Sequence, residues 1–142
     1  TSLAGDVYVE SEAVISGVLG IHQFVRVGRL SMIGGMTRIQ RDVPPFTIVE
    51  GTPARVRVIN EIGLERASFA PAEIAILKKA FRTLYHSHKP IGQALDDLDL
   101  FPSYESIQHL QRFLKLSIEG KKNDPDKNRG PIPGKSIERK SE

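Results

Sequence analysis

The chain of 142 residues contains no cysteine and no tryptophan, and aromatic residues make up only 6% of it. Without cysteine, neither disulfide bonds nor thiolate metal sites are possible. The apolar runs are too short to cross a bilayer, so we expect no transmembrane segment. The start, "TSLAGDVYVE", lacks the basic and then apolar regions of a secretory signal. With 39% hydrophobic and 26% charged residues, the composition predicts a soluble, globular, cytoplasmic protein.

Positive charge is concentrated at the end of the chain. The residues after Gly120 include seven basic and four acidic side chains, which account for the whole net charge of +3. A basic tail on a neutral body does not indicate nucleic-acid binding by a folded surface. Residues 121–142 are also rich in proline and glycine and almost empty of apolar residues, so we predict a disordered charged tail.

Aliphatic residues recur at every sixth position near the start of the chain. A helix repeats every 3.6 residues and a half-buried strand every two, so neither explains a period of six. Short parallel strands joined by tight turns do explain it, with three strands closing one triangular coil of about eighteen residues. We therefore predict a hexapeptide-repeat β-helix, and a small β-sandwich with fortuitous spacing is the alternative. The inward positions would be Leu3, Val9, Ile15, Ile21, Val27, Ile33 and Ile39.

Glycines close to these aliphatic positions would allow turns with positive φ. They are Gly5, Gly17, Gly28, Gly34 and Gly35.

The repeat fades after Val43, where "VPPF" marks an exit from the coil because proline cannot donate a ladder hydrogen bond. "FTIV" then predicts one last short strand, and the β-helix would occupy residues 1–58. A stack of little more than two coils leaves a bare strand edge. We therefore expect either partner chains around it or further coils before Thr1.

The second half of the chain predicts a small α-helical domain over residues 59–120. Apolar residues fall on one side of three segments at helical spacing. Proline begins the first segment, Pro90 precedes the second, and Ser103 is a good N-cap for the third. The predicted helices span Pro71–His86, Ile91–Leu98 and Ser103–Glu119.

Five stretches of the sequence, "LAGDV", "GIHQFVRVG", "MIGGM", "DVPPF" and "INEIGLERASF", resemble the UDP-N-acetylglucosamine O-acyltransferase family over about residues 1–119. The resemblance implies a truncated left-handed parallel β-helix followed by a small α-helical C-terminal domain. It also implies a homotrimer with active sites in clefts between neighbouring β-helices. The family transfers a 3-hydroxyacyl group from acyl carrier protein to the 3-hydroxyl of UDP-N-acetylglucosamine, the first step of lipid A biosynthesis. No metal, cofactor or acyl-enzyme intermediate is involved.

The same resemblance assigns roles to particular residues. In the family a histidine general base takes the proton from the sugar hydroxyl; its position lies upstream of this chain, so we expect the isolated chain to be inactive. Gly5 matches the glycine whose backbone N–H stabilises the oxyanion. His22 and Gln23 match positions lining the nucleotide-sugar site. Asn60 and Arg66 match residues near the nucleotide and its phosphates.

Three further positions bear on substrate choice. Gly35 matches the residue that limits the acyl pocket, and a glycine there leaves room for a longer acyl chain. Asp6 stands where the family usually has another histidine, and Ile62 stands where some members have an acidic residue. These two departures alter contacts near the sugar and the nucleotide.

Several polar residues admit a plainer interpretation. His22 follows an inward aliphatic, so its side chain should face outward from the coil. The patch of Lys78, Lys79 and Arg82 on the first predicted helix is either a solvated face or a docking surface for the acidic acyl carrier protein. We expect a solvated face for most of the coil arginines, a surface position for His109, and no chemistry for the histidines at the helix end. These residues are Arg26, Arg29, Arg38, Arg41, His86 and His88.

Two other functions stay open on the sequence alone. One is another hexapeptide acyltransferase of the same pathway, against which "IHQF" and "GLERASF" argue. The other is a non-catalytic trimerisation or binding module.

Overall fold

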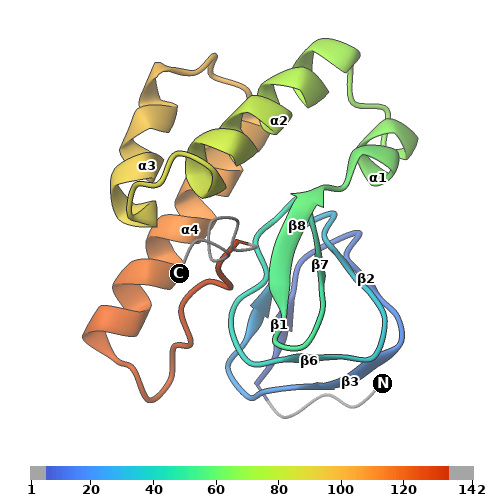
Figure 1. Cartoon of the computed structure of the whole chain (residues 1–142), viewed down its shortest axis with the longest axis vertical. Coiled ribbons are helices and arrows are strands. Elements are labelled where there is room, and N and C mark those ends of the chain that lie inside the picture. Colours follow the sequence, from blue (N-terminus) through green and yellow to red (C-terminus); the bar gives the residue numbers. More distant parts are fainter. Residues whose placement is uncertain (1–5, 135–142) are drawn as a thin grey trace, which may run out of the picture.

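A computed structural model describes residues 6–134, so Leu3, Gly5 and residues 135–142 lie outside the described part. Short strands wind into stacked three-sided coils, and the helices lie beside and above one end of the stack (Figure 1). The strands are β1 (Tyr8–Val9), β2 (Val14–Ile15), β3 (Val18–Ile21), β4 (Arg26–Val27), β5 (Met32–Ile33), β6 (Thr37–Ile39), β7 (Thr47–Glu50) and β8 (Arg55–Ile59).

The first two coils each contribute one strand to each of three walls, and β7 of the third coil adds a strand to one of them. Side one contains β1 and β4, side two contains β2, β5 and β7, and side three contains β3 and β6, all paired in parallel. Val9 pairs with Val27 and Ile21 with Ile39, which confirms the predicted coil of about eighteen residues. The chain leaves the stack through β8, which returns antiparallel to β7 on side two. The six-residue repeat does not predict this antiparallel strand.

Inward burial of the periodic aliphatics is confirmed from the second half of the first coil onward. Ile21 is 4% exposed, and Val27, Ile33 and Ile39 are fully buried. Val9 pairs in register with the buried Val27, so it shares the inward direction, but it is 40% exposed. Within the described residues the first coil has no strand on its free edge, and nothing there covers Val9.

The turns at the coil corners use the left-handed region of φ, but mostly without glycine. Glu12, Phe24 and Leu30 have φ values of 63°, 68° and 54°. Of the predicted turn glycines, Gly17 and Gly35 have positive φ. Gly28 serves another purpose, because a Cβ built on it would lie 2.6 Å from the Cα of Pro45 in the next coil.

The helices are α1 (Glu61–Arg66), α2 (Pro71–Tyr85), α3 (Ile91–Asp97) and α4 (Glu105–Asn123), with a 3-10 turn over Leu98–Leu100. The three predicted helices are confirmed within a few residues at their ends, and α1 is additional. The predicted N-cap Ser103 is wrong, since α4 begins after Tyr104 and has no side-chain cap. None of the helices in residues 6–134 is long and apolar enough to span a membrane.

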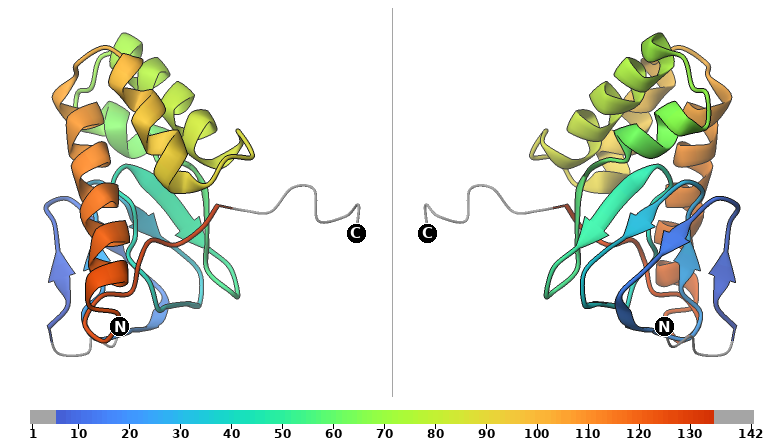
Figure 2. Two further views of the ribbon diagram at one scale, coloured as in Figure 1. Left: turned by 90° about the vertical axis from the view of Figure 1, so that its left-hand side faces the viewer. Right: turned by 90° about the vertical axis from the view of Figure 1, so that its right-hand side faces the viewer.

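Helix α4 packs against side one of the coils (Figure 2). His109 lies 2.8 Å from Oε1 of Glu10 through its Nε2 atom, and its ring meets that of Phe46 edge-on. The guanidinium of Arg26 stacks over Phe113 of α4, and that of Arg29 reaches Glu105. The expected surface position of His109 and solvated face for these two arginines are therefore wrong, because α4 covers this wall.

The disordered tail predicted from residue 121 is also wrong for the described residues. Helix α4 continues to Asn123, and residues 128–134 return along the third coil. Asp42 donates its backbone N–H to the carbonyl of Gly130 and accepts from the N–H of Ile132, which is 2% exposed. These ladder bonds and one buried side chain hold a segment whose composition alone predicted disorder.

Candidate functional site

The His22–Gln23 corner lies where side three turns into side one. The backbone N–H of His22 donates to Ile39 in the coil below, at 2.8 Å, and both side chains are exposed. The outward orientation predicted for His22 is confirmed. The Gln23 amide donates to Asp6, at 3.2 Å, and the Gln23 carbonyl accepts from Nε of Arg129 in the C-terminal segment. The corner therefore presents an imidazole and an amide on a backbone that hydrogen-bonds to the next coil and to the C-terminal segment.

A larger recess, the side-two groove, lies between the outer face of side two and helices α1 and α2. Its volume is about 970 Å³. Apolar side chains form its floor, one from each neighbouring strand in register, and three of them are 40–49% exposed. The floor residues are Val14, Met32, Ile48 and Val58.

Cations line the opposite wall of the side-two groove. Arg66 comes from the last turn of α1, and Lys78 and Arg82 come from one face of α2. Lys78 is already paired with Glu61, at 3.2 Å, so the two guanidinium groups are the stronger attractants for an anion. The groove thus combines an apolar floor with a wall of three cationic side chains, beside which the carboxylates of Glu61 and Glu65 also line the groove.

Asn60 lies at the inner end of this groove and is buried. Its side-chain oxygen caps α1 by accepting from the N–H of Gly63, and its amide donates to the carbonyl of Leu30, at 2.9 Å. Both halves of the amide group therefore have partners within the chain. Its evident role is to fix α1 against the coil corner, and the predicted contact with a nucleotide stays a prediction.

The other predicted site residues are spread over the molecule. Gly35 lies at the corner between sides two and three with open space where a Cβ would stand, and its role at the acyl pocket stays a prediction. Ile62 is 63% exposed at the groove. Lys79 lies over the ring of Phe101, 5.7 Å from its centroid, and does not line the groove. Gly5 lies outside the described residues.

The structure therefore brings together only part of the predicted set. Asn60, Arg66, Lys78 and Arg82 share one recess, whereas His22 and Gln23 lie on a different corner. The apolar floor was not predicted from the sequence, although the sequence contains a pattern that indicates it. An apolar residue precedes the inward aliphatic in three successive coils, at Val14, Met32 and Ile48, and that position points outward.

Two carboxylates fasten α4 to the coils. Burial opposes ionisation of Glu10, but hydrogen bonds from His109 and the Arg29 N–H, with nearby positive charge, hold its pKa below the ordinary value. Asp42 is 3% exposed and accepts from Ser117 Oγ, at 2.7 Å, and from the N–H of Arg26. Burial raises the pKa of Asp42 despite these two bonds. These groups organise the fold and do not line the groove.

No cluster of three or more histidine, aspartate or glutamate side chains within residues 6–134 is arranged to hold a metal ion. The corner and the groove present imidazole, amide, guanidinium, ammonium and carboxylate groups beside an apolar surface.

Comparison with known proteins relates this arrangement to one family. The family model described as UDP-N-acetylglucosamine O-acyltransferase, domain 2, matches residues 42–122. Proteins named acyl-[acyl-carrier-protein]–UDP-N-acetylglucosamine O-acyltransferase are 53% identical over 134 residues in a Synechocystis strain and 54% identical over 136 residues in Gloeothece citriformis. Each alignment covers 94% of this chain and 47% of the relative.

A solved structure agrees with the sequence relatives. The UDP-N-acetylglucosamine acyltransferase from Campylobacter jejuni superimposes with a TM-score of 0.77 at 29% identity, covering 94% of this chain and 48% of that one. The chain thus spans about half the length of the proteins it matches. Because the family model covers more than half of this sequence, the chain belongs to the UDP-N-acetylglucosamine O-acyltransferase family.

Proposed function

We propose that this chain forms the last coils and the helical domain of an enzyme that transfers a 3-hydroxyacyl group from acyl carrier protein to the 3-hydroxyl of UDP-N-acetylglucosamine. The side-two groove is the observation that carries the proposal. Its apolar floor suits an acyl chain, and the guanidinium group of Arg66 suits phosphate oxygens. The names of the relatives contain both substrates, which supports the same chemistry here as the first step of lipid A biosynthesis.

In the proposed reaction the sugar 3-hydroxyl oxygen attacks the thioester carbonyl carbon. An ester bond forms, the carbon–sulfur bond breaks, and the carrier protein leaves as its thiol. A histidine upstream of this chain would take the hydroxyl proton and return it to the departing sulfur. The N–H of Gly5 would donate to the oxyanion of the tetrahedral intermediate. The scheme requires neither a metal nor a cofactor.

We further propose that the coils form a left-handed β-helix and that three copies assemble into a homotrimer. His22 and Gln23 lie on one corner of the chain, and Arg66 lies at the groove on side two. A site containing all three would form where the corner of one copy meets side two of the next. The exposed floor of the groove supports such a covered surface, since free surfaces seldom leave a continuous apolar stripe open.

The cationic face of α2 is proposed to dock the acidic acyl carrier protein. Lys79 and Arg82 are the strongest contributors, because Lys78 is engaged with Glu61. We propose a cytoplasmic location for an enzyme that uses these substrates.

An acyl-transfer assay with radiolabelled 3-hydroxyacyl carrier protein tests the proposal. We expect no turnover from the isolated chain. A fusion of the N-terminal half of the Synechocystis relative to this chain should transfer acyl groups, and the variant Arg66→Gln of that fusion should be at least about tenfold slower. The control variant Arg112→Gln removes an exposed arginine on α4 and should match the parent fusion.

Turnover by the isolated chain at ordinary rates would contradict the missing-base argument. A folded, trimeric fusion without turnover would instead favour a non-catalytic binding module. A fusion that prefers a different acceptor sugar would favour another hexapeptide acyltransferase of the same pathway.

A further inference from the structure

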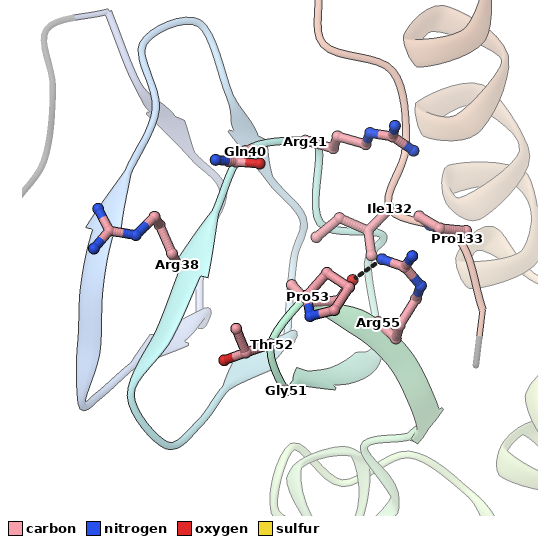
Figure 3. Close-up of a pocket in the computed structure, with 10 residues that line it drawn as sticks. Arg38, Gln40, Arg41, Gly51, Thr52, Pro53, Arg55, Ile132 and Pro133 are labelled. Carbon is pink, nitrogen blue, oxygen red and sulfur yellow. Dashed lines mark hydrogen bonds between the residues drawn. The ribbon is translucent and has the colours of Figure 1, made fainter. Parts of the chain in front are cut away.

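A second concavity, separate from the side-two groove, lies between β6, the turn joining β7 to β8, and the C-terminal segment. Its volume is about 420 Å³. Figure 3 shows its lining, which we call the arginine pocket. The lining residues are Arg38, Gln40, Arg41, Gly51, Thr52, Pro53, Ala54, Arg55, Ile132 and Pro133.

The charge of the arginine pocket has one sign. Three of the residues that line it are arginines, and none of the described lining residues carries a carboxylate. Within residues 6–134, no ion pair involves any of these three side chains. Elsewhere on the coils, Arg29 pairs with Glu12 and Arg57 pairs with Glu50. Like charges gathered in a recess repel each other and raise the local concentration of anions.

Two of the three arginines flank the C-terminal segment. In Figure 3 the guanidinium groups of Arg41 and Arg55 lie on opposite sides of Ile132 and Pro133, and Arg38 extends to the other end of the pocket. Arg55 is steadied by donating from Nη1 to the carbonyl of Ala54, at 2.7 Å. That contact occupies Nη1 and leaves the other N–H donors of the Arg55 guanidinium group available for a ligand. Arg41 and Arg55 are therefore the two arginines that border the C-terminal segment at this pocket.

Neutral polar groups complete the lining. The Gln40 amide and the Thr52 hydroxyl face solvent at this pocket. A mixture of guanidinium, amide and hydroxyl groups matches a compact ligand with several oxygens better than it matches a single carboxylate. The volume also falls within the range of small-molecule sites.

The position of the pocket in the coil stack separates it from the groove. Ile39 of β6 pairs with Ile21 of β3, so Gln40 and Arg41 stand one coil below His22 and Gln23. No residue of the pocket lines the side-two groove. The C-terminal segment that closes the pocket is the same one that reaches the Gln23 carbonyl.

We propose that the arginine pocket binds a phosphate-type oxyanion with at least two negative charges, held by Arg41 and Arg55. The planar forks of two guanidinium groups match paired phosphate oxygens. The oxyanion is either free pyrophosphate or the diphosphate of a nucleotide, and the experiment separates these two sources. The proposal concerns anion binding alone and does not rest on the proposed acyl transfer.

Isothermal titration of the full chain with sodium pyrophosphate, UDP and uridine provides the test. Pyrophosphate should bind, uridine should not, and added salt should weaken the binding. UDP binding tighter than pyrophosphate identifies a nucleotide as the source, and equal or weaker UDP binding identifies the free anion. The double variant Arg41→Gln/Arg55→Gln should weaken pyrophosphate binding by about tenfold or more.

The matched control is Arg112→Gln/Lys115→Gln, which removes the same charge from the exposed face of α4. It should change the affinity for pyrophosphate by less than about twofold, because screened distant charges contribute little. Arg41→Gln alone is a second variant whose exposed side chain leaves the strands intact. In amide NMR spectra, pyrophosphate should shift the signals of Gly51, Thr52 and Ile132 in the wild-type chain.

Three results would overturn the proposal. They are absence of pyrophosphate binding by the folded chain, equal weakening in both double variants, and NMR shifts confined to Arg66 and Arg82. Failure of the fusion enzyme in acyl transfer leaves this titration unaffected, so the two proposals fail separately.

Discussion

Replacing Gly28 with alanine tests whether the coils stack as tightly as the structure shows. A Cβ at Gly28 would lie 2.6 Å from the Cα and 2.8 Å from the Cδ of Pro45, and it would also crowd the nitrogen of that proline. Ordinary carbon–carbon contacts lie at about 3.5–4 Å, so neighbouring coils would have to separate by about 1 Å. The obstacle is mainly backbone, which cannot rotate away as a side chain can.

Overpacking of this kind costs about 1–3 kcal/mol, and we expect Gly28→Ala to reach about 3 kcal/mol because both coils must move. Alanine substitutions at two other glycines provide reference values for this stability cost. Gly35 has a φ of 47° with nothing within 4 Å of a Cβ, so Gly35→Ala should cost only the left-handed backbone, about 1 kcal/mol. Gly92 is exposed on α3 with open space, and Gly92→Ala should stabilise by up to about 1 kcal/mol.

Urea unfolding followed by circular dichroism at 25 °C measures all three variants. The expected order of stability is Gly92→Ala, wild type, Gly35→Ala and then Gly28→Ala. If Gly28→Ala lies within about 0.5 kcal/mol of the wild type, the coils are not packed as described and the reasoning fails. If Gly35→Ala lowers the free energy of unfolding more than Gly28→Ala does, backbone strain rather than coil spacing limits the stability of the stack.

Three further predictions concern the attachment of α4 and the groove. Asp42→Ala should destabilise the chain by about 2–4 kcal/mol, because the hydroxyl of Ser117 and a buried N–H lose their acceptor; an unchanged urea midpoint would contradict this. The pKa of Glu10 is lower in the folded chain, so its contribution to stability is present above about pH 4.5 and lost as pH falls through the folded value. Glu10→Gln should therefore flatten the acid limb of a stability–pH curve, and an unaltered limb would count against the contact with His109. In the fusion enzyme, Met32→Lys should lower kcat/KM by about tenfold or more by placing a charge on the acyl floor, and full activity would exclude this floor as the acyl site.

The period of six predicted the coil because it follows from local geometry. Side chains alternate between inward and outward along each short strand, and every sixth residue again points inward on the next side of the coil. The pairing of Ile21 with Ile39 shows this repeat over one full coil. The corners could not be located from glycine, however. Phe24 and Leu30 adopt the left-handed φ themselves, at a cost of about 1–2 kcal/mol per residue that burial of the coil interior offsets.

The C-terminal segment shows where composition fails as a guide. Residues 121–134 contain few apolar side chains, yet the third coil lacks a strand beside Asp42, and the backbone of Gly130 and Ile132 fills that place. One buried isoleucine and a few ladder bonds are enough when a preformed edge supplies the partners. Nothing in the local sequence reveals that edge, because it lies some ninety residues earlier in the chain.

The candidate site illustrates the same division between local and distant information. The outward positions of side two could be derived from the period alone, and Met32 and Ile48 mark an apolar line along it. The wall opposite that line depends on β8, whose antiparallel return carries α1 and α2 over side two and so sets Arg66 beside the floor. No hexad predicts that return. The period of six also places His22 on a corner of its coil, away from side two. In the proposed homotrimer, a site that uses both groups would be built from two copies, and a variant of either group should be rescued in mixed oligomers that carry the other group intact.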